Sequence, residues 1–293
     1  MAQAVDAEVV ETRTASSVRR GISPGRISLY VVLILIALFF VLPLIWMVAT
    51  SLKAESAVFR DRGLIPAEPT LENFERILTA GGQTPVLRYM FNSFGVATIG
   101  TVLTVFLTSL SGYAFARIDF RFKNILFSAL ITTLLLPGVM FLVPQYLLMS
   151  QLNLLNTWPA FMLPGLAGAF GVFFMRQFFM SIPVELEEAA YVDGAGRFKT
   201  FFSIILPLAG PAIATLAVIS FLGFWNDYLW PLITCQGPSC TLAPALRNLQ
   251  GTYSTRFALL MAGSVIAAVP VLILYLFSQR YIIQSVTSSG VKG

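Results

Sequence analysis

Long apolar segments that carry no charged side chain constrain the fold of this chain more than any other feature of its sequence. A helix that spans a bilayer needs about 20 predominantly apolar residues. Six segments meet or approach this length without any Asp, Glu, Lys or Arg: Ile27–Ser51, Tyr89–Phe115, Ile125–Met149, Trp158–Met175, Ile204–Asn226 and Phe257–Gln279. Only 11% of all residues are charged, against about 25% in soluble domains. The sequence therefore predicts an all-α membrane protein with six transmembrane helices.

The basic residues between these segments predict the orientation of the chain in the membrane. With six spans both termini lie on one side, and the connections on that side hold 12 Lys and Arg residues against 7 on the other. Because cytoplasmic loops carry the excess of Lys and Arg, we expect both termini in the cytoplasm. The first 26 residues are polar and lack the early apolar core of a secretory signal. The predicted parts are a cytoplasmic tail at 1–26, a membrane domain at 27–283 and a second cytoplasmic tail at 284–293.

The external connection after the first span contains one amphipathic segment, Thr70–Leu78. Thr70 can cap a helix there. Four apolar side chains recur at helical spacing on one face of it: Leu71, Phe74, Ile77 and Leu78. We expect a short helix that lies on the membrane surface.

Proline occurs repeatedly in or near the predicted spans. The positions are Pro43, Pro137, Pro144, Pro164, Pro207, Pro211 and Pro270. Within a bilayer each proline frees a carbonyl that neighbouring groups must satisfy. We expect kinked helices, which suit a pore that changes shape but also occur in static proteins.

A short charged segment at 181–207 separates the fourth and fifth spans. Pro183 is tolerated in the first turn of a helix. Three carboxylates follow near the positive end of that helix: Glu185, Glu187 and Glu188. Gly194 can end the helix, because glycine accepts the left-handed conformation. These residues predict a short helix–turn–helix with an acidic, small-residue surface toward the cytoplasm, although any multi-span protein has charged cytoplasmic loops.

The spacing of residues in this loop matches a known motif. The pattern Glu188-Ala189-Ala190-x3-Gly194-x9-Ile204-x-Leu206-Pro207 resembles the EAA loop in the membrane subunits of ATP-binding-cassette (ABC) importers. Seven such residues at background usage coincide by chance about once in 10⁸ to 10⁹ positions. The resemblance implies the type I ABC importer permease fold, with this loop as the coupling helix that docks on a separate ATPase. It assigns this contact to Glu187, Glu188, Ala189, Ala190, Asp193, Gly194 and Ala195.

Further motifs extend the resemblance over most of the chain from Ile27 onward. They resemble the carbohydrate-uptake branch, in particular the second permease of maltose- or glycerol-phosphate-type systems. The motifs are Asn92-Ser93, Tyr113-Ala114-Phe115-Ala116-Arg117, Pro137, Pro144, Ser181-x-Pro183, Asp193-Gly194-Ala195, Trp225-Asn226-Asp227, Trp230-Pro231-Leu232 and Val291-Lys292-Gly293. Gln284-Ser285 depart from the pattern, in which a basic residue and glycine are usual, and this departure leaves the contact of the tail with the ATPases open.

The resemblance implies a set of partners in a prokaryotic cell membrane. They are a homologous partner permease, two copies of a cytoplasmic ATPase and an extracytoplasmic substrate-binding lipoprotein. The implied solute is a sugar, oligosaccharide or polyol, and a non-carbohydrate solute is the alternative within the same family. We expect no cofactor on this chain, because no stretch reads as the glycine-rich loop that cradles nucleotide phosphate. ATP and Mg²⁺ would bind to the ATPase subunits.

Polar side chains in or near the spans are the candidates for a substrate pathway. They are Asn92, Ser93, Thr132, Thr133, Gln145, Asn226 and Asp227. For each of them the alternative role is a hydrogen bond that packs helices together. In some members of the family the partner permease supplies most substrate contacts, so the resemblance does not choose between these roles.

Two cysteines flank a turn-forming sequence in the last external loop. Cys235 and Cys240 enclose Gln236-Gly237-Pro238-Ser239. Outside the cell disulfides persist, and Gly-Pro favours a turn that could bring the two sulfurs together. The hypothesis is a disulfide that stiffens this loop, and the alternative is two free thiols.

The composition argues against several other functions. The chain has no His, which removes His-based metal sites and most general-base chemistry, so we expect no enzymatic activity. An ion-coupled secondary transporter needs ionisable groups within its spans, and the six predicted spans contain none. A passive channel would have no need of an ATPase-docking loop. The basic residues flank the spans and form no patch for nucleic acid.

Overall fold

The computed structural model describes residues 24–79, 86–247 and 256–290, and the described secondary structure is helical throughout. The chain divides into two units, Met1–Trp46 and Met47–Gly293. Helix α1 (Pro24–Ser51) supplies the described part of the first unit and continues into the second. Most of the predicted tail at 1–26, and all of Val291-Lys292-Gly293, lies outside the described residues.

Three continuous helices are long and apolar enough to cross a membrane: α1, α3 (Val86–Arg117) and α14 (Phe257–Gly290). Three further pairs of helices reach that length only when taken together, because each pair is bent at a short break. The bends are 102° for Lys123–Leu135 with Gly138–Gln151, 52° for Trp158–Gly165 with Ala169–Ser181, and 78° for Arg197–Leu208 with Gly210–Asn226. If each bent pair is one span, the described residues contain the six spans that the sequence predicts.

The bent pairs are built from shorter elements. The first contains α4 (Lys123–Thr132), two 3-10 turns (Thr133–Leu135 and Gly138–Phe141) and α5 (Leu142–Gln151). The second contains α6 (Trp158–Met162), a 3-10 turn (Leu163–Gly165) and α7 (Ala169–Ser181). The third contains α9 (Arg197–Thr200), a π-helical turn (Phe201–Ile205), α10 (Leu206–Leu208) and α11 (Gly210–Asn226). The remaining α-helices are α2 (Glu72–Leu78), α8 (Glu185–Val192), α12 (Leu229–Thr234) and α13 (Leu242–Arg247).

Backbone conformation explains where the breaks fall. Leu136 is extended, with ψ of 130°, because the residue before a proline is disfavoured in the helical region. Gly168 is also extended, with ψ of 134°. The third break lies at Ala209, which is closely flanked by prolines on both sides. Proline therefore accounts for two of the three breaks. Two of the prolines expected to kink helices lie inside continuous helices instead: Pro43 and Pro270.

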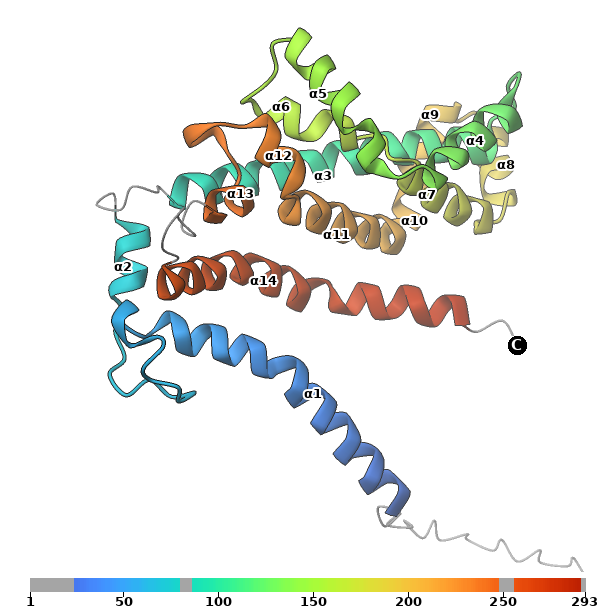
Figure 1. Cartoon of the computed structure of the whole chain (residues 1–293). Helices are drawn as coiled ribbons and strands as arrows, with labels where there is room; N and C mark the ends of the chain where they lie inside the picture. The colour runs from blue at the N-terminus through green and yellow to red at the C-terminus, as the bar shows by residue number, and fades with distance from the viewer. Residues whose placement is uncertain (1–23, 80–85, 248–255, 291–293) are drawn as a thin grey trace, which may run out of the picture. The chain divides into compact units, whose positions relative to one another are not determined.

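Helix α3 is the central element of the second unit, and α7 and α11 pack along it (Figure 1). Small residues let α3 and α7 approach closely. A Cβ atom at Gly112 of α3 would lie 2.8 Å from Cβ of Met175 and 3.0 Å from the backbone nitrogen of Arg176 in α7. A Cβ atom at Gly171 of α7 would lie 2.8 Å from Cγ2 of Thr108 in α3. Glycine is therefore required at both crossing points of this helix pair.

Buried apolar side chains of the second unit form three clusters. The first joins α2, α3, α11, α13 and α14 around Tyr89, Phe221 and Trp225. The second joins α3 and α7 to the segment 201–216 around Met175, Phe179 and Ile205. The third surrounds Phe161 and includes Cys235. The second cluster lies next to α8, and the third lies next to the loop with the two cysteines, so both candidate sites rest on packed core.

Helix α2 lies within the segment predicted as an amphipathic helix, and one polar side chain is part of its buried face. It begins at Glu72, whose backbone N–H donates to Thr70 Oγ1 over 3.2 Å. Its buried residues are Asn73 and Ile77, while Leu71 and Leu78 are exposed. Asn73 Nδ2 donates to the carbonyl oxygens of residues 51 and 53, at 2.9 and 2.8 Å. The inward face of α2 is therefore set by a buried amide as well as by Ile77, and the position of this helix on the membrane surface stays a prediction.

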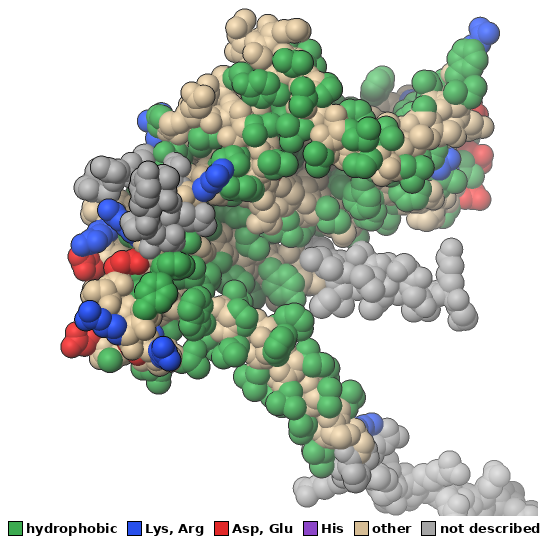
Figure 2. All heavy atoms as spheres, in the orientation of Figure 1, with side chains coloured by type: hydrophobic (Ala, Val, Ile, Leu, Met, Phe, Trp, Pro, Cys, Tyr) green, Lys and Arg blue, Asp and Glu red, His purple; other side chains and the backbone are tan. Residues whose placement is uncertain are grey.

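Charged and apolar side chains separate on the surface of the second unit. On the face shown in Figure 2, charged groups gather near α2 and near α8, and hydrophobic side chains dominate between them. This separation is the pattern expected of helices whose middle lies in hydrocarbon and whose ends lie in water. At the chain end, α14 continues to Gly290, beyond the predicted end of the membrane domain at residue 283.

Candidate functional site

The segment predicted as a helix–turn–helix forms α8 and α9, joined by a turn at Gly194. Gly194 has a φ of +80°, a conformation that L side chains rarely adopt. Its backbone N–H donates to Tyr191 O at 3.0 Å, and the N–H of Ala195 donates to Ala190 O at 2.9 Å. These two bonds are the Schellman arrangement that satisfies the last carbonyls of a helix. Gly194 therefore ends α8 as its sequence position predicts.

Glu187 lies inside the protein and not on the exposed face of α8. Only 3% of its surface is exposed, and its Oε1 pairs with Arg117 Nε at 2.8 Å. Tyr113 donates its hydroxyl to Glu187 Oε2 at 2.9 Å, and Arg117 also donates to the carbonyl oxygen of Ile182. The expectation that Glu187 contributes to an exposed docking surface is therefore wrong, because the side chain joins α8 to the end of α3.

Sequence reasoning missed Arg117 and Tyr113 as partners of this loop. Both belong to the Tyr113–Arg117 motif that resembles the ABC permeases, but nothing local assigns that motif to α8. The spacing within α8 offered one signal. Glu187 and Ala190 are three residues apart and therefore share a helix face, and the structure shows that this face is buried.

The outer face of α8 and the turn that follows it carry most of the remaining residues of the predicted contact. Glu188, Ala189, Asp193 and Gly194 are exposed, Ala195 is half-buried, and Ala190 faces inward. Two exposed apolar side chains, one at the end of α8 and one in α9, were not anticipated. Val192 is 88% exposed and Phe198 is 78% exposed. The surface is therefore mixed acidic and apolar, which is more typical of a protein contact than of a solvated loop.

A cavity of about 630 Å³ lies among the helices of the second unit. Its wall comes from α3, the bend before α5, the bend after α6, the end of α11 and the start of α12. It is lined by Thr104, Gly138, Val139, Phe141, Leu142, Gln145, Phe161, Pro164, Gly165, Ser220, Gly223, Phe224, Asp227, Leu229 and Trp230. Of the candidates for a substrate pathway, Gln145 and Asp227 line this cavity.

Aromatic rings and a carboxylate are held in place at this cavity. Trp230 Nε1 donates to Ala160 O at 2.8 Å, which fixes the indole ring. Asp227 Oδ1 accepts from the backbone N–H of Trp230 at 3.4 Å. Burial raises the pKa of Asp227 above its ordinary value, and the hydrogen bond from Trp230 opposes this shift. The arrangement offers flat apolar faces beside hydrogen-bonding groups, which is the usual make-up of a small-molecule site.

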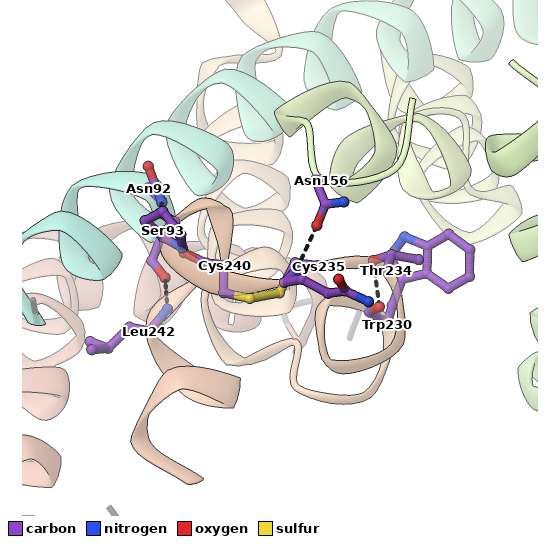
Figure 3. The surroundings of a disulfide bond; sticks show 10 residues. Asn92, Ser93, Asn156, Trp230, Thr234, Cys235, Cys240 and Leu242 are labelled. Carbon is purple, nitrogen blue, oxygen red and sulfur yellow. Dashed lines mark hydrogen bonds between the residues drawn. A yellow bond between two sulfur atoms is a disulfide. The ribbon is translucent and has the colours of Figure 1, made fainter. Parts of the chain in front are cut away.

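Asn92 and Ser93 do not reach this cavity but hold the cysteine loop, as Figure 3 shows. Asn92 Nδ2 donates to the carbonyl oxygens of Pro238 and Cys240, at 3.0 and 2.9 Å. Ser93 Oγ accepts from the backbone N–H of Leu242 at 2.7 Å. Both residues therefore have the packing role that was the alternative to substrate contact.

The other polar candidates also lie outside the cavity lining. Asn226 is exposed at the end of α11. Thr132 and Thr133 donate their hydroxyls to the backbone carbonyls of Ser128 and Leu130 within their own helical segment. Such local bonds satisfy the hydroxyls within the segment.

Cys235 and Cys240 form a disulfide in a loop that is tied to two other segments. Their Cα atoms are 5.1 Å apart. Asn92 holds the Cys240 side of the loop, and Asn156 Oδ1 accepts from the N–H of Gln236 at 2.5 Å on the Cys235 side (Figure 3). The Asn156 N–H also donates to Thr234 O at 3.0 Å. The loop is therefore anchored at both ends. Within the described ranges, no cluster of Cys, Asp and Glu has the make-up of a metal site.

The structure combines apolar helices long enough to span a membrane, an exposed turn between α8 and α9, and a cavity among the helices. These features are those of a multi-span membrane transport subunit. Residues 109–288 match the family described as binding-protein-dependent transport system inner membrane component, and the chain belongs to this family. It is a permease and not an enzyme, and permeases of this family bind no cofactor themselves.

Curated relatives match over nearly the whole chain. The arabinooligosaccharides transport system permease protein AraQ of Halalkalibacterium halodurans is 36% identical over 262 residues, which are 88% of this chain and 93% of the relative. The lactose transport system permease protein LacG of Rhizobium radiobacter is 34% identical over 261 residues, covering 89% and 94%. A solved bacterial ABC transporter that imports the acidic polysaccharide alginate has a chain with a TM-score of 0.75 and 23% identity, covering 87% of this chain and 95% of that chain. The last comparison shows a shared fold.

Proposed function

We propose that this chain is one of two permeases of an ABC importer and that its cavity forms part of the pathway of a sugar, oligosaccharide or polyol. The observation that carries the proposal is the cavity, in which the rings of Phe141, Phe161, Phe224 and Trp230 lie beside Gln145 and Asp227. Sugars present apolar ring faces and many hydroxyls, so they fit aromatic walls with a few polar groups. The names of the relatives AraQ and LacG, which refer to arabinooligosaccharides and lactose, support the same class of solute.

The proposed complex contains a homologous partner permease, two cytoplasmic ATPases and an extracytoplasmic binding protein. Two findings support this assembly. The family is described as binding-protein-dependent, and a bacterial alginate ABC transporter with similar fold, with a TM-score of 0.53, is described in complex with a substrate-bound periplasmic protein. The excess of Lys and Arg on one side of the spans supports cytoplasmic termini and a cytoplasmic α8.

The outer face of α8 is the proposed contact with the ATPase. Glu188 and Ala189 form its acidic, small-residue part. The exposed apolar side chains of Val192 at the end of α8 and Phe198 in α9 would also be covered in the complex. The left-handed turn at Gly194 fixes the angle between this helix and the segment that returns to the membrane. Rigid elements of this kind can transmit a displacement because packed helices move as bodies.

The contact between Glu187 and Arg117 is the proposed route from α8 into the membrane. Arg117 ends α3, and Thr104 of the same helix lines the cavity. At about 1.5 Å per residue, these two positions are about 20 Å apart along one helix. A displacement of α8 would therefore reach the cavity wall through a single rigid element and one buried ion pair.

Reconstitution of the complete complex tests the proposed function. We expect proteoliposomes with enclosed ATP to accumulate at least one saccharide or polyol when the loaded binding protein is outside, and to accumulate none without ATP. The matching binding protein should be screened against saccharides, polyols, amino acids and metal ions. A receptor that binds amino acids or metal ions and no saccharide or polyol would overturn the class of solute.

A further inference from the structure

Among the described residues, the cavity lining carries one charged side chain, and it is acidic. Asp227 is the only charged residue among the side chains that the described part of the chain contributes to the lining. The other polar groups are neutral: Thr104, Gln145, Ser220 and the Trp230 indole. No Lys or Arg from the described ranges reaches this wall, so nothing on it compensates the carboxylate.

A purely structural role for Asp227 must be separated from an electrostatic one. Its Oδ1 accepts the N–H of Trp230 in the first turn of α12, which is a capping contact. Asparagine caps helices about as well as aspartate, so Asp227→Asn removes the charge and keeps the cap. The structure therefore offers a substitution that tests the charge alone.

We propose that Asp227 makes this cavity selective for uncharged saccharides and excludes anionic ones, such as uronates and sugar phosphates. The proposal rests on the proposed function and narrows its substrate class. A half-buried carboxylate accepts hydrogen bonds from sugar hydroxyls, and such charge-assisted bonds are stronger than neutral ones. The same charge repels an anion in a cavity whose apolar walls weaken solvent screening. Rejection by an unfavourable charge is an established way to discriminate between otherwise similar ligands.

Thiol labelling measures the charge at the wall directly. Ser220 lines the cavity on α11, seven residues before Asp227, which is about 10 Å along a helix. The native cysteines are bonded to each other, so Ser220→Cys introduces the reactive thiol. The probes are the trimethylammonium-ethyl and sulfonatoethyl methanethiosulfonates, which differ in the sign of their charge. We expect the ratio of cationic to anionic labelling rates to fall on the order of tenfold when Asp227→Asn is added.

An exposed carboxylate outside the cavity provides the matched control for the labelling ratio. Asp119→Asn, which removes an exposed carboxylate outside the cavity, should leave the ratio unchanged. Equal yields and melting temperatures of the purified complexes would show that Asp227→Asn retains the fold. A labelling ratio that does not change in Asp227→Asn would overturn the proposal.

Protection of the same thiol tests selectivity without the binding protein. The uncharged reagent methyl methanethiosulfonate is applied to the assembled complex in the presence of a neutral oligosaccharide or its uronate counterpart. We expect the neutral saccharide to protect Ser220→Cys with either residue at 227, and the uronate to protect only with Asn. Equal protection by both saccharides with Asp227 present would overturn the selectivity. Protection by neither would count against the proposed function, while the labelling ratio still decides the electrostatic claim.

Discussion

Arg117 Nε and Glu187 Oε1 lie 2.8 Å apart in a buried ion pair that joins two segments 70 residues apart in the sequence. Tyr113 satisfies the second carboxylate oxygen of Glu187, and Arg117 also binds the carbonyl of Ile182 at the end of α7. A buried pair with these extra hydrogen bonds is costly to break from one side, because the remaining charge is left uncompensated. The pair therefore holds α8 in one orientation relative to α3 and α7.

Glu187→Met should destabilise the protein by about 3–5 kcal/mol, because Arg117 would remain buried and unpaired. The double variant Arg117→Met/Glu187→Met should recover much of this loss, since apolar side chains of similar length replace both charges. If the pair also transmits motion, the double variant should assemble with its ATPases but transport less solute for each ATP hydrolysed. Thermal unfolding and the ratio of uptake to hydrolysis measure these two effects separately.

An ion pair in the same region whose carboxylate is fully exposed provides the control for this experiment. Asp119 and Lys123 lie 3.4 Å apart at the surface, and exposed pairs contribute about 0–1 kcal/mol. Asp119→Asn should therefore change neither stability nor coupling appreciably. Full coupling in the stable Arg117→Met/Glu187→Met variant would show that the ion pair only supports the fold.

Gly194→Val should strain the end of α8, because valine at a φ of +80° costs about 1–3 kcal/mol. We expect the variant to insert in the membrane and to lose most ATP-dependent uptake, because the angle between α8 and α9 changes. Gly196→Val is the matched control, because Gly196 is extended and a Cβ atom there meets no neighbour within 4 Å. Normal uptake by Gly194→Val would contradict the proposed role of the turn between α8 and α9.

Glu188→Lys tests the outer face of α8 without disturbing the core. Its side chain is exposed, so the free energy of unfolding should change by no more than about 0.5 kcal/mol. We expect the variant to retain less ATPase on purification and to transport little solute, because the charge at the proposed contact is reversed. Retention of the ATPase in normal amount, together with normal uptake, would exclude this residue from the contact.

The sequence predicted the spans, the end of α8 and one helix break, because interactions between neighbouring residues determine each of them. The spans are readable because a bilayer demands long charge-free segments, and the end of α8 is readable because Gly194 accepts a left-handed conformation. The break at Pro137 follows from the constraint on the residue before a proline. The break at Gly168 was not predicted as such, because an extended glycine leaves no mark in composition.

Contacts between distant segments could not be predicted in the same way. Glu187 reads as one of three exposed carboxylates until its partner Arg117 is placed beside it. Asn92 reads as a polar group in a span, and only the fold brings it to the carbonyls of residues 238 and 240. Asp227 was one of several polar candidates for a substrate pathway. Only the structure shows that it lines a cavity and that no Lys or Arg stands among the described lining residues.

Cys235 and Cys240 should resist alkylation in the native protein until a reductant is added, because both thiols are bonded in the structure. Intact mass spectrometry under non-reducing conditions checks this, and two alkylated thiols would contradict it. Replacing both residues by Ser should destabilise the loop by about 2 kcal/mol, the entropy of closing so short a loop. Asn92→Leu should loosen the same loop while leaving the disulfide intact, because its amide holds the carbonyls of Pro238 and Cys240.

Asp61 should make the segment before α2 sensitive to acid. The backbone N–H groups of Ala67 and Gly63, at 3.1 and 3.0 Å, lower the pKa of the Asp61 carboxyl, and Lys53 beside it acts in the same direction. Because the pKa is lower in the folded state, this stabilisation is complete above about pH 4, near the ordinary pKa of Asp. It is lost as the pH falls through the depressed value. Limited proteolysis of the segment between pH 7 and pH 3 should show faster cleavage only at the acid end, and Asp61→Asn should be cleaved faster across the range. Equal acid sensitivity of the wild type and Asp61→Asn would assign the effect to another group.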